Sequence, residues 1–198
     1  MRSQALVILW LTALAAAIVA LFWRNEFVYN LPTPVPANYT KVDTGRQIQF
    51  AALEIPSNNK PLFIHFFNPG CPCSRFNITH FKALVKEYHT QVNFAMVVLS
   101  PQQFTATEIR EKYDIDMPVY FDSTIAAACG VYSTPQAVIL NAEQQLVYRG
   151  NYNKSRYCTD KKTAYARLAL SGLLQNKKYA FNQFALTAYG CQLPKCTK

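Results

Sequence analysis

A short apolar segment that leads into two closely spaced cysteines is the feature that most constrains the fold of this chain. Residues 62–67 are apolar or aromatic except for His65, and the turn-forming residues Asn68-Pro69-Gly70 follow them. Such a run predicts a buried central strand that ends in a turn. Cys71 comes next, and apolar residues then recur at helical spacing from about Pro72 to His89. The sequence therefore predicts a buried strand, a cysteine at its end and a helix that begins there.

Further apolar segments extend this unit into a larger sheet. Strands are expected over residues 94–99 and 137–140, and the second of these is followed by a turn and another strand over 145–148. Helices are expected over residues 107–113 and from about 160 to 174. The order strand, helix, strand, helix, strand, strand, helix predicts an α/β fold with parallel crossovers and an antiparallel hairpin at one edge.

Cys71 stands where a cysteine becomes reactive. At a helix start, unpaired backbone N–H groups and the helix dipole stabilise the thiolate, which is the nucleophilic form of the side chain. Pro72 suits the first helical position, where a missing N–H leaves no bond unmade. These features predict a nucleophilic cysteine at this end of the sheet.

A second motif, Thr134-Pro135, precedes the expected hairpin, which ends at Tyr148-Arg149-Gly150. Together with the strand, cysteine and helix described above, it resembles the thioredoxin superfamily, and most of all the membrane-anchored, exported thioredoxin-like proteins of bacteria. The resemblance covers residues 46–175. It implies a thioredoxin-like fold, that is, a central mixed sheet flanked by helices, with Cys71 as nucleophile. It also implies that Pro135 is a cis proline beside the thiol and that the Thr134 backbone is free to pair with an extended substrate.

The chain departs from this family at the second cysteine. The redox enzymes of the family carry C-x-x-C, whereas Ser74 stands at the second position here and Cys73 falls one residue earlier. Three interpretations stay open: Cys71 and Cys73 form a strained, labile disulfide; a distant cysteine, Cys129 or Cys158, resolves Cys71; or the thiolates hold a soft metal such as Cu(I). A purely structural role is a fourth.

The function favoured by these residues is thiol–disulfide exchange with exported proteins, without a resident cofactor or metal. Cys71 attacks a substrate disulfide and Cys73 displaces the mixed disulfide, while Thr134 and Pro135 bind the substrate. By the resemblance, His65 relays a proton between the sulfurs, and a hydrogen-bonded core histidine is the alternative. The expected partners are protein thiols and disulfides and an unidentified redox protein.

Three other functions compete with this one. A copper chaperone on the same fold uses C-x-x-x-C and a distal histidine, a spacing that this chain lacks. A disulfide-stapled assembly module without catalytic activity is the second. A thiol peroxidase is the third, but Asn68 stands where that pattern has Thr or Ser.

The N-terminal residues have a different composition. From Ala5 to Trp23 the only polar residue is Thr12. A helix that rises ~1.5 Å per residue over this run crosses a hydrocarbon core of roughly 30 Å. A cleaved signal peptide is the alternative, although its apolar region is usually only ~7–15 residues long. We expect a membrane anchor over residues 1–24 and a proline-rich linker over 25–45, with a single pass through a bacterial inner membrane and the domain over 46–175 in the periplasm.

Residues 176–198 form a C-terminal extension that contains Cys191 and Cys196. In an exported domain we expect these two cysteines to form a structural disulfide, and a link from Cys158 to one of them is the alternative. The net charge of +9 is concentrated after Arg149, where Asp160 is the only acidic residue. Because no recognition motif accompanies this charge, we expect a solvated basic surface and no nucleic-acid partner.

Overall fold

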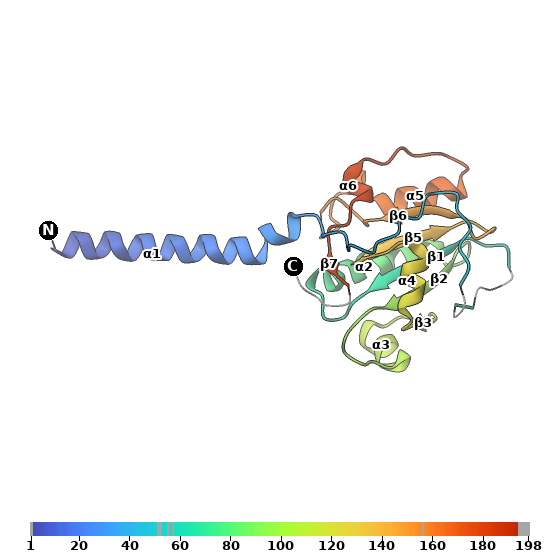
Figure 1. Ribbon diagram of the computed structural model, residues 1–198, viewed down its shortest axis with the longest axis horizontal. Coiled ribbons are helices and arrows are strands. Elements are labelled where there is room, and N and C mark those ends of the chain that lie inside the picture. The colour runs from blue at the N-terminus through green and yellow to red at the C-terminus, as the bar shows by residue number, and fades with distance from the viewer. Residues whose placement is uncertain (1, 51–52, 55, 57, 156, 194–198) are drawn as a thin grey trace.

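The computed structural model describes residues 2–193 apart from 51–52, 55, 57 and 156. Its helices and strands run in a mixed order along the chain (Figure 1): α1 (Arg2–Asn25), η1 (Phe27–Asn30), β1 (Leu62–Phe67), α2 (Pro72–Tyr88), β2 (Asn93–Val98), α3 (Ala106–Tyr113), β3 (Val119–Tyr120), α4 (Ser123–Cys129), β4 (Ser133–Thr134), β5 (Gln136–Leu140), β6 (Leu146–Gly150), η2 (Lys161–Thr163), α5 (Tyr165–Leu174), α6 (Gln183–Leu186) and β7 (Cys191–Gln192).

The central sheet has five strands in the order β3-β2-β1-β5-β6. Strand β1 is parallel to β2, and β2 is parallel to β3. Strand β5 is antiparallel to both β1 and β6. The mixed sheet with an antiparallel hairpin at one edge, expected from the order of the elements, is confirmed. A separate two-stranded sheet joins β4 to β7.

Alternation along β1 divides the core into two layers. Phe63 and Phe67 pack with α2, α3 and α5 on one face of the sheet. Ile64 and Phe66 pack with α4 on the other face, where Val42 of the N-terminal segment also lies. Both faces of β1 are buried because helices cover both, which explains its nearly continuous apolar sequence.

The helix ends next to the site are set by local sequence. Asp122 caps α4 by accepting a hydrogen bond from the backbone N–H of Thr124. Gly130 ends the same helix in the left-handed region, with φ of 67°. Helix α4 therefore stops just before β4, and the chain turns from it directly into the Thr134-Pro135 segment.

The proline-rich segment predicted as a linker over 25–45 contacts the domain closely. Thr33 is 2% exposed, and its backbone N–H donates to the carbonyl oxygen of Ala188 at 2.8 Å. Val42 is buried in the core layer beside α4. This part of the chain is thus held along the surface by hydrogen bonds and apolar contacts with the C-terminal segment and α4.

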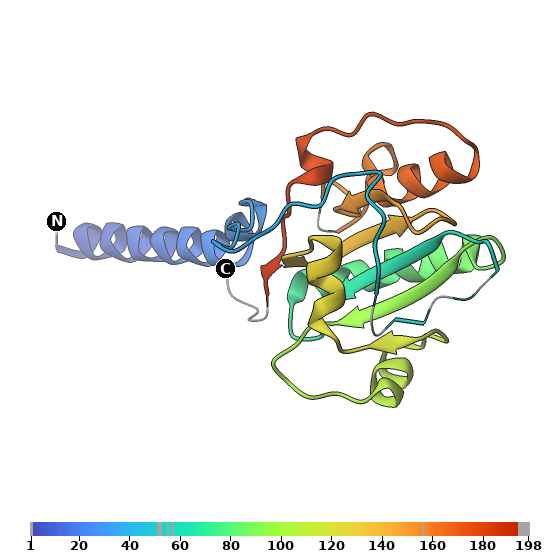
Figure 2. The same cartoon turned by 45° about the vertical axis from the view of Figure 1, so that its right-hand side comes forward.

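Helix α1 extends away from the domain in both views (Figures 1 and 2). Among the described residues, the stretch Ser3–Asn25 is long and apolar enough to cross a membrane, and none of it is buried against the domain. Its length and composition agree with a membrane anchor or with a signal sequence. Strand β7 lies on the side of the domain from which α1 leaves (Figure 2).

Candidate functional site

Cys71 occupies the N-cap position of α2, directly after the turn that ends β1. Its backbone is extended, its N–H donates to the Asn68 carbonyl oxygen at 3.0 Å, and Pro72 begins the helix. Its sulfur is bonded to that of Cys191, and the two Cα atoms are 6.3 Å apart. Both cysteines are buried. The strand, turn and helix expected from the sequence thus place Cys71 as predicted, but its bonded partner is distant in the chain.

This pairing corrects the structural disulfide predicted between Cys191 and Cys196. Cys191 is bonded to Cys71, and Cys196 lies outside the described residues. The physical reason is the short ladder between β4 and β7, in which Thr134 and Cys191 are register partners. The ladder brings Cys191 to the loop that faces the start of α2. Two residues of strand have no detectable sequence period, so this contact could not be read from the sequence.

Cys73 belongs to the same cluster of sulfurs. It is the second residue of α2 and is 2% exposed. The sulfur atoms of Cys71, Cys73 and Cys191 all lie within 4.8 Å of one another. Three sulfurs this close allow disulfide exchange among them, and in the reduced state such a thiolate set suits a soft metal ion.

Ser74 stands where the C-x-x-C pattern has its second cysteine, and here it forms part of the turn before α2. Its side chain is fully buried, and its hydroxyl oxygen accepts a hydrogen bond from the Asn68 backbone N–H at 3.3 Å. The Asn68 side chain in turn accepts from the Gly70 N–H at 2.9 Å. Ser74 therefore holds the turn that presents Cys71.

The peptide bond between Thr134 and Pro135 is cis, as the resemblance implies. The carbonyl oxygen of Thr134 lies 3.7 Å from the Cys71 sulfur. The backbone of Thr134 is paired with Cys191, so the edge that the resemblance assigns to an extended substrate is occupied by the chain's own C-terminal segment.

His65 lies in the middle of β1 and is fully buried. Its Nδ1 and the Tyr152 hydroxyl are 2.7 Å apart, and its ring stacks on Phe81 at 4.3 Å. Burial lowers the pKa of His65 to about 3, so the imidazole is neutral at physiological pH. These contacts are those of a hydrogen-bonded core histidine. The proton relay between the sulfurs stays a prediction, and Tyr152 is the polar partner that the sequence did not reveal.

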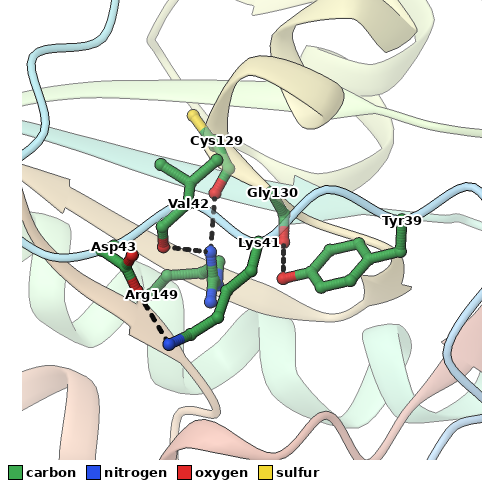
Figure 3. Close-up of polar contacts among 7 residues, drawn as sticks. All are labelled: Tyr39, Lys41, Val42, Asp43, Cys129, Gly130 and Arg149. Atoms are coloured by element: carbon green, nitrogen blue, oxygen red, sulfur yellow. Dashed lines mark hydrogen bonds and ion pairs between the residues drawn. The ribbon is translucent and has the colours of Figure 1, made fainter.

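Cys129, one candidate for a distant resolving cysteine, lies at the end of α4 and is fully buried. Burial raises the pKa of its thiol to about 12. Figure 3 shows the neighbouring Arg149, whose guanidinium donates to the carbonyl oxygens of Val42 at 2.9 Å and Cys129 at 3.3 Å. Arg149 thereby fastens the N-terminal segment to the end of α4.

Cys158, the other candidate, is partly buried and accepts a hydrogen bond from the Asn77 side-chain amide at 3.2 Å. Burial raises the pKa of its thiol to about 11. Cys158 and Cys73 line a common cavity of about 180 Å³, but within the described chain the sulfur cluster comprises Cys71, Cys73 and Cys191. A protonated thiol outside the cluster is poorly placed to attack Cys71.

A family model described as "Domain of unknown function (DUF6436)" matches residues 40–194 of the chain. No curated protein matches the sequence. Similar solved structures include a hypothetical protein from Sinorhizobium meliloti 1021, with 17% identity, a TM-score of 0.63 and coverage of 79% of this chain and 96% of that one. An uncharacterized conserved protein from Geobacillus kaustophilus has 20% identity, a TM-score of 0.58 and coverage of 76% and 92%.

A thiol:disulfide interchange protein of the thioredoxin family, from Chlorobium tepidum TLS, is also similar in structure. Its identity to this chain is 14%, its TM-score is 0.50, and the match covers 68% of this chain and 99% of that one. At this identity the likeness shows the fold. The thioredoxin-like fold implied by the sequence resemblance is confirmed.

Proposed function

We propose that this chain, which belongs to the family described as Domain of unknown function (DUF6436), is a membrane-anchored thiol–disulfide oxidoreductase. The observation that carries the proposal is the disulfide of Cys71 at the first turn of α2, with the sulfur of Cys73 close to both of its atoms. A cysteine at the start of a helix, bonded to a second cysteine on a thioredoxin-like fold, is an arrangement that supports thiol–disulfide exchange.

The chemistry follows from the position of Cys71. When its disulfide is broken, the N–H groups and dipole of α2 stabilise the Cys71 thiolate. This thiolate attacks one sulfur of a substrate disulfide, so that a mixed disulfide forms and one substrate thiolate leaves with the electron pair. A second cysteine of the chain then attacks Cys71 and releases the other substrate thiol. Cys73, predicted from the sequence for this step, and Cys191 both lie within the sulfur cluster.

The N-terminal segment supports a location at the membrane surface. Helix α1 ends at Asn25, and Thr33 is already hydrogen-bonded to the domain. The connection over 26–33 spans at most ~29 Å even when fully extended. If α1 is retained as an anchor, the sulfur cluster stays close to the bilayer. The expected setting is the periplasmic face of a bacterial inner membrane, where protein thiols and an unidentified redox partner exchange with Cys71.

Loss of Cys71 tests this function directly. We expect Cys71→Ser to reduce exchange with a labelled disulfide peptide at least 100-fold, measured as release of the labelled thiol by full-length protein in detergent. Cys129→Ala is the matched control, because Cys129 is buried outside the cluster and should retain exchange within twofold. Exchange at the wild-type rate in Cys71→Ser would refute the proposed function.

Binding of a soft metal is the second candidate function, and the closeness of the three sulfurs is the observation that favours it. Among the described residues His65 lies outside this set of sulfurs, and its Nδ1 contacts the Tyr152 hydroxyl. Titration of reduced protein with Cu(I) in the presence of a competing chelator separates the two functions. One equivalent held tightly, and lost in Cys71→Ser, would favour metal delivery over disulfide exchange.

A further inference from the structure

We infer that Cys191 is the resolving cysteine of this chain, and that β7 is a built-in strand partner of β4 which Thr33 of the N-terminal segment holds beside Cys71. This inference rests on the proposed function, because it names the group that completes the exchange reaction at Cys71. It also assigns a role to the proline-rich segment beyond that of a spacer.

The first support is the way β7 meets β4. Thr134 pairs with Cys191, and Ser133 pairs with Gln192, in an antiparallel ladder. The backbone N–H of Leu193 extends the contact by donating to the Tyr132 carbonyl oxygen at 3.4 Å. Backbone hydrogen bonds of a strand are satisfied by any extended segment of the right register. The chain therefore supplies, from its own C-terminal segment, the extended partner that the edge of β4 can accept.

The Thr33 hydroxyl stabilises this pairing with three hydrogen bonds. Its Oγ1 donates to the Gly190 carbonyl oxygen at 2.9 Å and accepts the Gly190 N–H, also at 2.9 Å. Because its single proton is used in this way, the Ser133 hydroxyl, 3.1 Å away, donates to it. Thr33 and Ser133 are both buried, so these bonds do not compete with water. The residue next to Cys191 is thus fixed to both the N-terminal segment and β4.

Gly190 allows the strands to approach this closely. A Cβ built at this position would overlap the Thr134 carbonyl oxygen and lie 2.6 Å from the Ser133 hydroxyl oxygen. Only a residue without a side chain fits here. The close approach sets the register that places Cys191, and no other residue of β7, opposite Thr134.

The preceding part of the C-terminal segment is docked independently of the disulfide. The side-chain amide of Asn151 donates to the carbonyl oxygens of Phe184 at 2.8 Å and Thr187 at 2.6 Å. The backbone N–H of Asn151 donates to the Ala185 carbonyl oxygen at 2.8 Å. These bonds hold residues 184–187 without any contribution from the disulfide, so Cys191 stays tethered near Cys71 even when a substrate displaces β7. The tether gives Cys191 a high effective concentration for the return reaction.

The reaction balances with Cys191 in this role. The reduced Cys71 thiolate attacks a substrate disulfide, and the first substrate thiolate leaves and takes up a proton. Cys191 loses its proton to solvent and attacks the Cys71 sulfur of the mixed disulfide, so the Cys71–Cys191 bond forms and the second substrate thiolate leaves. Two electrons pass to the substrate. A substrate backbone that pairs with Thr134 must displace β7. When β7 returns to β4 and the Cys71–Cys191 bond forms, the substrate is released.

Trapping the mixed disulfide tests the assignment. Reduced full-length protein is mixed with oxidised glutathione, quenched with an alkylating reagent at set times and mapped by mass spectrometry. We expect the glutathione adduct on Cys71 to last at least tenfold longer in Cys191→Ser than in wild type, with Cys73→Ser resembling wild type. An adduct that persists in Cys73→Ser but not in Cys191→Ser would overturn the assignment and leave the proposed function intact. Adduct formation and exchange that continue in Cys71→Ser would refute the proposed function itself.

The positioning role of Thr33 is tested by the redox equilibrium. In glutathione buffers we expect Thr33→Val to lower the equilibrium constant for Cys71–Cys191 formation about tenfold, which is a rise of ~30 mV in reduction potential for a two-electron couple. Thr40→Val is the matched control, because Thr40 is exposed and should leave the potential unchanged. Circular dichroism checks that both variants are folded. A potential in Thr33→Val equal to that of wild type would overturn the role of Thr33.

Discussion

Thr134 and Cys191 are register partners between β4 and β7, and the carbonyl oxygen of Thr134 also lies 3.7 Å from the sulfur of Cys71. One residue therefore contacts both halves of a disulfide whose cysteines are 120 positions apart in the chain. A change that moves β7 relative to β4 alters how closely the two reduced sulfurs approach, so the redox equilibrium of the pair reports on the docking of the C-terminal segment.

Substitution of Gly190 should separate β7 from β4. In Gly190→Ala the added methyl group collides with Thr134 and Ser133, so the strand must move away. We expect the equilibrium constant for formation of the Cys71–Cys191 disulfide to be at least tenfold lower than in wild type. The fraction of disulfide present in a glutathione buffer measures this constant. Leu186→Ala, at an exposed position of the same segment, should match wild type. A wild-type equilibrium in Gly190→Ala would contradict the close packing at this position.

The burial of His65 predicts a loss of stability in acid. The folded state holds a neutral imidazole because burial lowers the pKa of His65 to about 3, whereas an unfolded chain binds the proton below about pH 6.5. Above about pH 6.5 both states hold a neutral imidazole, and His65 does not lower the free energy of unfolding. As the pH falls from 6.5 toward 3, only the unfolded state takes up the proton, so the free energy of unfolding decreases by up to ~1.4 kcal/mol per pH unit.

Urea unfolding between pH 4 and 8 measures this decline. The difference in unfolding free energy between wild type and His65→Gln reports the contribution of His65 together with its electrostatic coupling to His80, whose charge also lowers the pKa of His65. We expect the two curves to converge as the pH falls. His89→Gln, at an exposed position, serves as the control and should run parallel to wild type. Parallel curves for His65→Gln would show that the buried imidazole does not titrate in this way.

Cys129 and Cys158, which lie outside the sulfur cluster, should be unreactive in the native state. Burial raises the pKa of Cys129 to about 12 and that of Cys158 to about 11. At pH 8 about one such thiol in a thousand, or fewer, is ionised. We expect iodoacetamide to label neither cysteine in native protein within a time that labels both completely in guanidinium, as read by peptide mapping. Rapid native labelling of Cys129 would contradict its buried position.

Alanine substitutions at two glycines with positive φ distinguish the energetic cost of backbone strain from the cost of steric overlap. Gly130 has φ of 67°, and a Cβ there would lie 2.6 Å from Arg149 Nη1 and 3.1 Å from Val42 Cγ2. Gly45 has φ of 87°, with open space around it. We expect Gly45→Ala to cost roughly 1 kcal/mol of unfolding free energy, from strain alone, and Gly130→Ala roughly 2–3 kcal/mol. Equal losses in urea unfolding would show that Arg149 moves aside without cost.

The local elements of this protein were determined by the sequence itself. The apolar run of β1 was predicted over residues 62–67 and is observed there, because burial on both faces leaves a continuous signal over a short range. The helix predicted over 107–113 is α3, which begins at Ala106 behind a complete capping box. The helix expected from about 160 to 174 is divided: a 3-10 turn precedes α5, which begins at Tyr165. The position of Cys71 at a helix start followed from the same local rules.

The tertiary structure alone decided which groups meet. Cys191 pairs with Cys71, and not with the nearby Cys196, because a two-residue ladder with β4 brings it there, and such a ladder carries no periodic signal. Thr33 looked like part of a proline-rich spacer, yet its hydroxyl is buried against Gly190. Propensity and periodicity act over a few neighbouring residues, whereas these contacts join residues 57, 120 and 157 positions apart, and only the packed fold determines them.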